Sequence, residues 1–267
     1  MRRQALRFGF SPEKTLLWTE ANLDPAFHNR MKSFLIKGSR GFGYWCWKPQ
    51  VVLQALSQMP PNDILLYADV GCHLNPNGMP RFLQYFNALH DSDFVVFQSK
   101  PHPVESRPQQ ECQWTKGDVL DFFHVRENRK ILESGQIAGG VFLVRNTQPV
   151  VRFFQDFRTC CMENFHLVDD SPSHSPNCPE FREHRHDQSL FSIMCKLAGH
   201  DDHSFPVDDF SPTAPNASEL PILAKRDIAY GWRALIPRPI KSVLIQCLAA
   251  CNMLPTWKPV TTNEKCG

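Results

Sequence analysis

The stretch Asp63-Ile64-Leu65-Leu66-Tyr67-Ala68-Asp69-Val70-Gly71-Cys72-His73 predicts a buried strand that ends in a carboxylate. A continuous apolar run bounded by turn residues is typical of such a strand, and this one ends at Asp69, with Gly71 breaking it. In open α/β sheets, ligands bind at the carboxyl ends of strands. We therefore expect Asp69 to lie at a binding site.

Strands and helices alternate along the rest of the chain. Apolar runs predict strands, and amphipathic periodicity predicts helices. The predicted strands cover residues 15–19, 94–98 and 141–144. One predicted helix begins at Pro49, and three others cover residues 80–89, 149–165 and 187–197. This alternation favours an α/β fold with a mostly parallel sheet and helices on both faces.

The last quarter of the chain has a weaker pattern. We assign residues 1–205 to the main domain and residues 206–267 to a C-terminal extension that packs on it. A basic stretch precedes the apolar run from Ser242 to Leu254. We expect a helix there that closes the core, and the alternative is peripheral membrane contact through residues 225–254.

Composition narrows the class of protein. The 267 residues carry a net charge of +2, so bulk charge gives no argument for nucleic acid as a partner. No run of 18 apolar residues is present, and no apolar segment of a signal peptide follows the first residues. The ten cysteines include no Cys-x-x-Cys pair and favour buried free thiols over a disulfide framework. We expect a cytoplasmic protein, with peripheral membrane association as the variant.

Asp69 and His73 are candidates for holding a divalent cation. On an extended backbone, the side chains of residues 69, 71 and 73 point to one face, and Gly71 leaves room between the other two. A divalent cation such as Mn²⁺ or Mg²⁺ there could neutralise charge on a diphosphate. The alternative is that Asp69 caps a turn and that His73 is structural.

Two glycine-rich segments are candidates for contact with a ligand. In the segment from Gly38 to Pro49, Tyr44 and Trp45 could stack on a base or a sugar, and Lys48 stands where a helix N-terminus could meet phosphate. A packed aromatic corner is the alternative. Gly139 and Gly140 precede a strand, where they either leave space for a sugar or form a tight turn.

The densest polar cluster is Glu-His-Arg-His-Asp-Gln-Ser over residues 183–189. Asp187 is placed to cap the helix that follows, but capping does not explain the two histidines and the arginine before it. His184, His186 and Asp187 also have the spacing of metal ligands, which leaves a metal-dependent hydrolase as one alternative function.

Taken in order, these motifs resemble those of GT-A-fold glycosyltransferases. They are most similar to bacterial-type sugar transferases with Leu-Tyr-x-Asp-x-Gly-Cys at a strand end and His-Arg-His-Asp-Gln-Ser before a helix. They are more distantly similar to the retaining transferases of lipopolysaccharide synthesis and glycogenin. The resemblance covers roughly residues 35–200.

This resemblance implies a retaining transfer of a sugar from a nucleotide-diphosphate donor to a hydroxyl of a glycan or lipid-linked acceptor. It makes residues 1–205 a GT-A-like catalytic domain whose usual first strand is not apparent. It implies a divalent cation, Mn²⁺ or Mg²⁺, but Gly71 replaces the second acid of the family's Asp-x-Asp motif. A degenerate sugar-binding protein is therefore a second alternative function. The implied catalytic residues are Asp187 and Gln188, the donor-binding residues are Tyr44, Trp45, Lys48, Asp69, Gly139, Gly140 and His186, and the metal ligands are Asp69 and His73.

Overall fold

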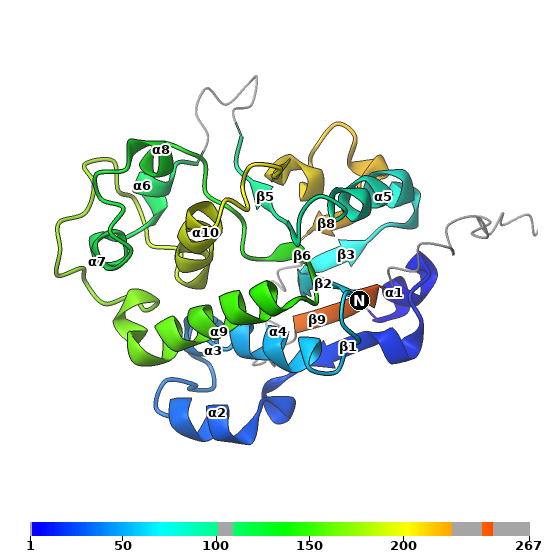
Figure 1. Ribbon diagram of the computed structural model, residues 1–267, viewed down its shortest axis with the longest axis horizontal. Helices are drawn as coiled ribbons and strands as arrows, with labels where there is room; N and C mark the ends of the chain where they lie inside the picture. The colour runs from blue at the N-terminus through cyan, green and yellow to red at the C-terminus, as the bar shows by residue number, and fades with distance from the viewer. Residues whose placement is uncertain (1, 101–108, 226–241, 248–267) are drawn as a thin grey trace, which may run out of the picture.

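The computed structural model describes residues 2–100, 109–225 and 242–247, the last of these as backbone only (Figure 1). The fold is α/β, as the sequence predicts. Its main sheet has five strands in the order β1 (Thr15–Trp18), β9 (Ser242–Cys247), β2 (Ile64–Asp69), β6 (Val141–Arg145) and β4 (Phe94–Val95).

Every neighbouring pair in this sheet is antiparallel, so the prediction of a mostly parallel sheet is wrong. Alternating helices and strands suggest crossovers that return each strand in the same direction. Here β6 runs against β2, with Leu66 opposite Leu143, and β4 runs against β6. The order of elements along a chain does not set strand direction, because direction depends on the end of the sheet at which each connection re-enters.

Helices cover both faces of the sheet, as expected. On one face, α4 (Lys48–Leu56) and α9 (Gln148–Glu163) lie side by side, and α10 (Asp187–Leu197) joins the same core (Figure 1). On the other face lie α1 (Arg2–Phe8) and α5 (Met79–Ala88). Side chains along β2 alternate between the two cores: Leu65 and Tyr67 belong to the first, and Ile64, Leu66 and Ala68 to the second.

The remaining elements are short. The other α-helices are α2 (Pro25–Met31), α3 (Gly41–Tyr44), α6 (Glu111–Trp114), α7 (Gly117–Phe122) and α8 (Arg129–Leu132). Strand β3 (Cys72–Leu74) pairs with β8 (Ile222–Ala224), and β5 (Phe97–Gln98) pairs in parallel with β7 (Phe205–Pro206). Single 3₁₀ turns cover Pro12–Lys14, Glu20–Asn22, Pro76–Gly78, Phe165–Leu167, Val207–Phe210 and Ala217–Glu219.

The C-terminal extension contributes a strand to the main sheet. Residues 242–247 form β9 between β1 and β2, so the prediction of a helix is wrong for these residues. The run Ser-Val-Leu-Ile-Gln-Cys has β-branched residues that suit a strand, and pairing on both sides satisfies its backbone groups. Residues 226–241 and 248–254, most of the segment expected to contact a membrane, lie outside the described residues.

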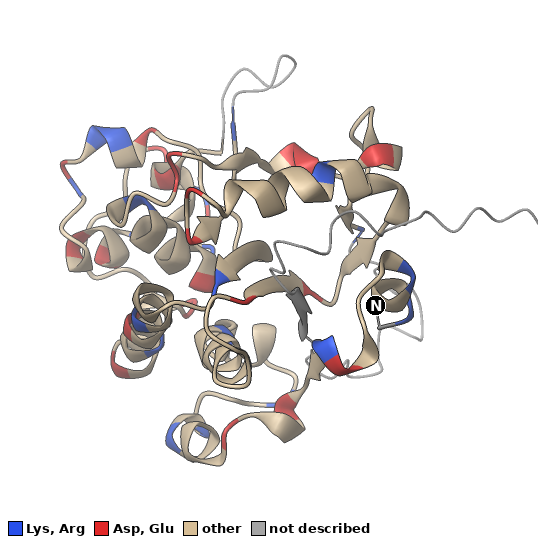
Figure 2. Cartoon of the chain, turned by 45° about the vertical axis from the view of Figure 1, so that its right-hand side comes forward, with Lys and Arg blue, Asp and Glu red and all other residues tan. Residues whose placement is uncertain are grey.

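Acidic and basic residues are interspersed over the helices (Figure 2). Among the residues that the structure describes, no helix is both long enough and apolar enough to cross a bilayer. The boundary at residue 205 stays a prediction.

We predict that a chain ending at Lys241 does not fold, because β1 loses the strand with which it pairs and β2 loses one of its two neighbours. A chain ending at Cys247 keeps that strand and is the control. Circular dichroism and thermal unfolding would compare the two. A cooperative transition in the shorter chain, at the temperature of the control, would contradict the placement of β9 between β1 and β2.

Candidate functional site

A buried ion pair joins the first residues of two helices. Lys48 begins α4 and Asp187 begins α10, and Lys48 Nζ lies 2.5 Å from Asp187 Oδ2. The side chains are only 5% and 6% exposed. The same ammonium donates a hydrogen bond to the Gly139 carbonyl at 2.8 Å and lies 5.5 Å from the centre of the Tyr67 ring. Lys48 therefore connects α4, α10, the segment before β6, and β2.

Neighbouring charges determine the ionisation of this pair. Burial, with a smaller contribution from the charge of Asp69, raises the pKa of Asp187 to about 6, against the opposing effect of Lys48. Burial alone would lower the pKa of Lys48, but Asp187 and Asp69 together raise it. At neutral pH the site therefore holds one ammonium and two carboxylates, a local charge of about −1.

Asp69 stands half-buried at the end of β2, as predicted. Its Oδ1 accepts a hydrogen bond from the Tyr67 hydroxyl at 2.8 Å, and its backbone N–H donates to the Gly140 carbonyl at 2.9 Å. A Cβ on Gly140 would lie 2.9 Å from Asp69 Oδ2, closer than such atoms approach. Gly140 therefore makes room for the Asp69 carboxylate.

Gly139 permits a similar close approach. A Cβ there would lie 3.3 Å from Cα of Gln188 and 3.5 Å from Lys48 Nζ. The Gly139 N–H donates to Gln188 Oε1 at 3.2 Å, and Gln188 Nε2 donates to Gln136 Oε1 at 2.7 Å. Both ends of the Gln188 amide are thus held by the protein. This gives Gln188 a positioning contact, and its predicted catalytic role stays a prediction.

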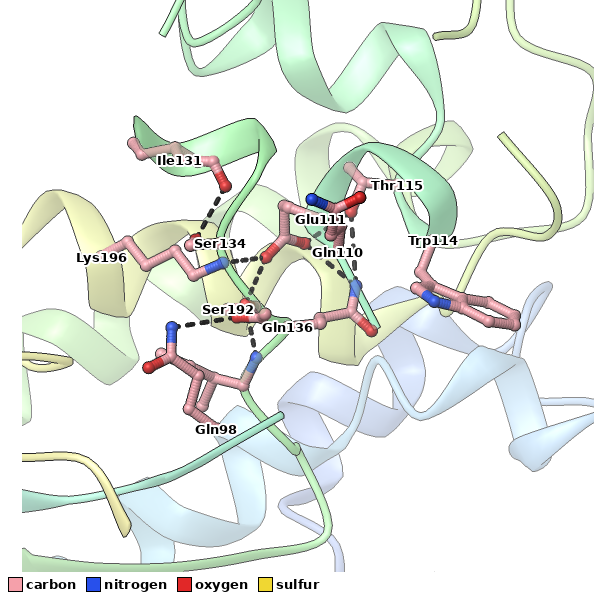
Figure 3. A network of polar contacts seen from close by, with 12 residues as sticks. Gln98, Gln110, Glu111, Trp114, Thr115, Ile131, Ser134, Gln136, Ser192 and Lys196 are labelled. Carbon is pink, nitrogen blue, oxygen red and sulfur yellow. Dashed lines mark hydrogen bonds and ion pairs between the residues drawn. The ribbon is translucent and has the colours of Figure 1, made fainter. Parts of the chain in front are cut away.

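A fully buried carboxylate anchors this chain of hydrogen bonds (Figure 3). Glu111 accepts from Thr115 (2.7 Å) and Gln136 (3.0 Å) at Oε1, and from Ser192 and Lys196 (both 2.6 Å) at Oε2. An ionised carboxylate only accepts hydrogen bonds, so Gln136 must turn its NH₂ group toward Glu111. Its oxygen then faces Gln188, which fixes the orientation of both amides.

The predicted aromatic segment packs against the predicted polar cluster. Phe42, Tyr44 and Trp45 all have positive φ, between 51° and 59°, which turns the chain tightly at this point. The rings of Tyr44 and Trp45 lie 5.0 and 5.7 Å from the His186 ring. A Cβ on Gly41 would lie 2.4 Å from the Trp45 ring. In this structure the two rings therefore pack on the protein, and stacking on a donor stays a prediction.

Three charged residues lie near His186, and of these only Glu183 belongs to the polar cluster predicted from the sequence, whereas Arg40 and Asp170 were not predicted. Its Nε2 is 3.6 Å from Asp170 Oδ1. Arg40 forms ion pairs with Asp170 at 3.4 Å and with Glu183 at 2.8 Å. No spacing rule connects Arg40 to Asp170, 130 positions away, so only the fold brings them together.

His184 has a structural role. Its Nε2 lies 2.8 Å from the Leu167 carbonyl oxygen, and its Nδ1 accepts from the Lys116 N–H at 3.4 Å. Burial and the nearby Lys116 lower its pKa to about 3, so the ring is neutral. With both nitrogens engaged, His184 does not support the hydrolase alternative.

The two proposed metal ligands lie on different strands, Asp69 at the end of β2 and His73 on β3. His73 lies on β3, and its Nδ1 is hydrogen-bonded to the Gln4 amide of α1 at 3.1 Å. Within the described part of the chain, no group of three or more His, Cys, Asp or Glu side chains could hold a metal ion. Asp69 contacts Tyr67 and Gly140 of the candidate site.

Comparisons with known proteins add little. No family model matches the chain, and no curated protein matches it. A crystal structure of mouse xyloside xylosyltransferase 1 in its apo form aligns with 15% identity and a TM-score of 0.37. The alignment covers 68% of this chain and 58% of that one. At this TM-score the likeness does not establish a shared fold. Any function must therefore be inferred from the chain's own residues.

We predict that Lys48→Met lowers the free energy of unfolding by about 3–5 kcal/mol at about pH 8, because Asp187 stays buried without its cation. The pKa of Asp187 is already above its ordinary value, and losing Lys48 raises it further. The cost of ionised Asp187 is therefore present above its folded-state pKa and disappears as the pH falls. We expect a clearly smaller loss at about pH 5.

Urea unfolding at the two pH values would measure this difference. Arg30→Met, in an exposed ion pair with Glu163, is the control and should have little effect at either pH. An equal loss at both pH values would contradict the assignment of an ionised Asp187.

We predict that Lys196→Met destabilises the protein by about 3–5 kcal/mol, because Glu111 is 0% exposed and loses its cation. The double variant Glu111→Gln/Lys196→Met should be more stable than Lys196→Met, since a neutral amide is cheaper to bury alone. Denaturant unfolding of the unmodified protein, Glu111→Gln, Lys196→Met and the double variant forms a double-mutant cycle. Purely additive losses would show that the pair is not coupled.

Proposed function

We propose that this protein is a glycosyltransferase that moves a sugar from a nucleotide-diphosphate donor to a hydroxyl of a glycan or lipid-linked acceptor. One observation carries the proposal: the buried Lys48–Asp187 pair lies against Gly139, next to Asp69 at the end of β2. Sugar transfer needs carboxylates that accept hydrogen bonds from sugar hydroxyls. It also needs negative charge near the anomeric carbon, where positive charge develops.

Asp187 suits the second requirement. Lys48 opposes the effect of burial on the pKa of Asp187 and so favours its ionised form. Gln188 and Gly139 hold the adjoining backbone through hydrogen bonds that lead back to Glu111. A carboxylate held in this way needs no reorganisation when charge develops beside it. Retention of anomeric configuration comes from the resemblance alone and stays part of the proposal.

The net charge of the site favours a metal ion that binds together with the donor. One lysine against two carboxylates leaves net negative charge, which repels a diphosphate. Mg²⁺ is commonly bound by one or two carboxylates together with substrate phosphates. Half-buried Asp69 fits that arrangement, with the donor supplying the other ligands. In this proposal the ion, Mn²⁺ or Mg²⁺, neutralises the leaving diphosphate and binds together with the donor, and His73 is not required.

Calorimetric titration with UDP-, GDP- and dTDP-sugars, with and without Mn²⁺, tests the proposal. We expect binding that requires Mn²⁺ and weakens at least about tenfold in Asp69→Asn, because the ion loses its protein ligand. Asp91→Asn, at an exposed position after α5, is the control. Absence of binding to every donor would contradict the proposal.

Turnover is measured on the same samples as release of nucleoside diphosphate in the presence of glycan acceptors. We expect Asp187→Asn to lose turnover. Binding without turnover in the unmodified protein would favour the degenerate sugar-binding alternative.

A further inference from the structure

The backbone at His186 has a conformation that side chains strongly disfavour. Its φ of 53° and ψ of −128° belong to a region occupied mainly by glycine. Such a conformation costs energy, and it persists where the surroundings impose it, frequently at functional sites. The sequence carries a histidine here, so the imidazole itself needs an explanation.

The contacts of the imidazole determine its protonation. His186 Nδ1 lies 2.8 Å from the Val168 carbonyl oxygen, which can only accept, so Nδ1 carries the proton. Burial and the nearby Arg40 lower the pKa of His186, although the Val168 carbonyl, Asp170 and Glu183 act in the opposite direction. The neutral ring therefore directs the lone pair of Nε2 away from Val168.

This lone pair has no partner within the described residues. The His186 side chain is only 3% exposed, and its Nε2 is buried without a hydrogen bond. An unsatisfied buried acceptor costs free energy, so its presence points to a ligand atom that completes it. The rings of Tyr44 and Trp45 pack beside the imidazole and limit how it can move.

A second acceptor faces the first. Asp170 Oδ1 lies 3.6 Å from His186 Nε2, too far for a hydrogen bond between them. The Asp170 side chain is 47% exposed, so this end of the pair opens to solvent. Arg40 lies 3.4 Å from the same oxygen and holds the carboxylate in place. The pair thus presents two adjacent acceptors, one buried and one accessible.

We propose that His186 Nε2 and Asp170 Oδ1 bind a vicinal diol of a sugar, each accepting a hydrogen bond from one hydroxyl. Hydroxyls on adjacent ring carbons are close enough to donate to two acceptors at this separation. A ligand with a single donor would satisfy one acceptor only, and an anion without a hydroxyl has no hydrogen to donate to either acceptor. The inference rests on the proposed function only for the expectation that the ligand is a sugar.

The diol could come from the ribose of the donor or from a pyranose. Histidine ¹⁵N resonances of the labelled protein distinguish these sources and need no turnover. In the free protein we expect Nδ1 of His186 to be protonated and Nε2 to be unprotonated. UDP and methyl glucoside are the two probes. Their controls are dUDP and methyl 3-deoxyglucoside, which carry no vicinal diol.

We expect the Nε2 resonance to shift with UDP or with methyl glucoside, and not with the matching deoxy control. A shift with UDP assigns the ribose, and a shift with methyl glucoside assigns a pyranose. A protonated Nε2 in the free protein, no shift with either probe, or an equal shift with the deoxy control would overturn the inference.

A substitution provides an independent measurement. His186→Gly removes the imidazole and relieves the backbone, so the protein should remain folded while affinity for the shifting probe falls at least tenfold. His124→Gly is the matched control, since His124 is an exposed histidine that also has positive φ, 55°. Unchanged affinity in His186→Gly would also overturn the inference.

The two proposals fail separately. Mn²⁺-dependent binding of nucleotide sugars with no response at His186 would remove the diol site and keep the transferase. A response at His186 to methyl glucoside, without Asp69-dependent binding of any nucleotide sugar, would remove the transferase and keep the diol site.

Discussion

Burial of the Lys48 ammonium against Asp187 is the interaction on which the candidate site depends. Each residue begins a helix, so the pair fixes the start of α4 relative to the start of α10. An ammonium with a side chain only 5% exposed requires nearby acceptors, and these are Asp187 and the Gly139 carbonyl. Both helices and the segment before β6 are thereby drawn to the end of β2. Asp69 stands at that end, where its charge acts on both members of the pair.

A second buried charge, that of Glu111, is linked to the Lys48–Asp187 pair through a chain of hydrogen bonds. Glu111, fully enclosed and paired with Lys196, orients the Gln136 amide (Figure 3). The Gln136 amide in turn orients the Gln188 amide, which accepts from the Gly139 N–H. Ion pairs of this kind contribute little net stability, because desolvation offsets their attraction. Their effect is on geometry: a polar network with every partner present allows few alternative arrangements. The network therefore ends on Gln188 and Gly139, next to the Lys48–Asp187 pair.

The architecture differs from the one that the resemblance implied, and this bears on function. An antiparallel main sheet with β9 between β1 and β2 is not the mostly parallel sheet expected of a GT-A-like domain. The proposed activity therefore rests on the side chains that meet at the end of β2, and not on the order of the strands. Fold and function are separate arguments, because one chemistry can be carried by different folds.

Local properties of the sequence were enough to predict the strand at Ile64–Asp69, the helix at Asp187–Leu197, and helices on both sheet faces, because hydrophobic periodicity and burial express them directly. Residue types likewise singled out Lys48, Asp69, His186 and Asp187. Strand direction and the place of β9 depend on which backbone edges meet, and no local pattern encodes this. The partners of the site residues also required the tertiary structure: Asp170 and Arg40 around His186, and Glu111 beneath Gln188, are far apart in the chain. The sequence by itself thus determined which side chains are candidates for the site, and only the tertiary structure decided what each one contacts, since long-range contacts follow from the packing of the whole chain.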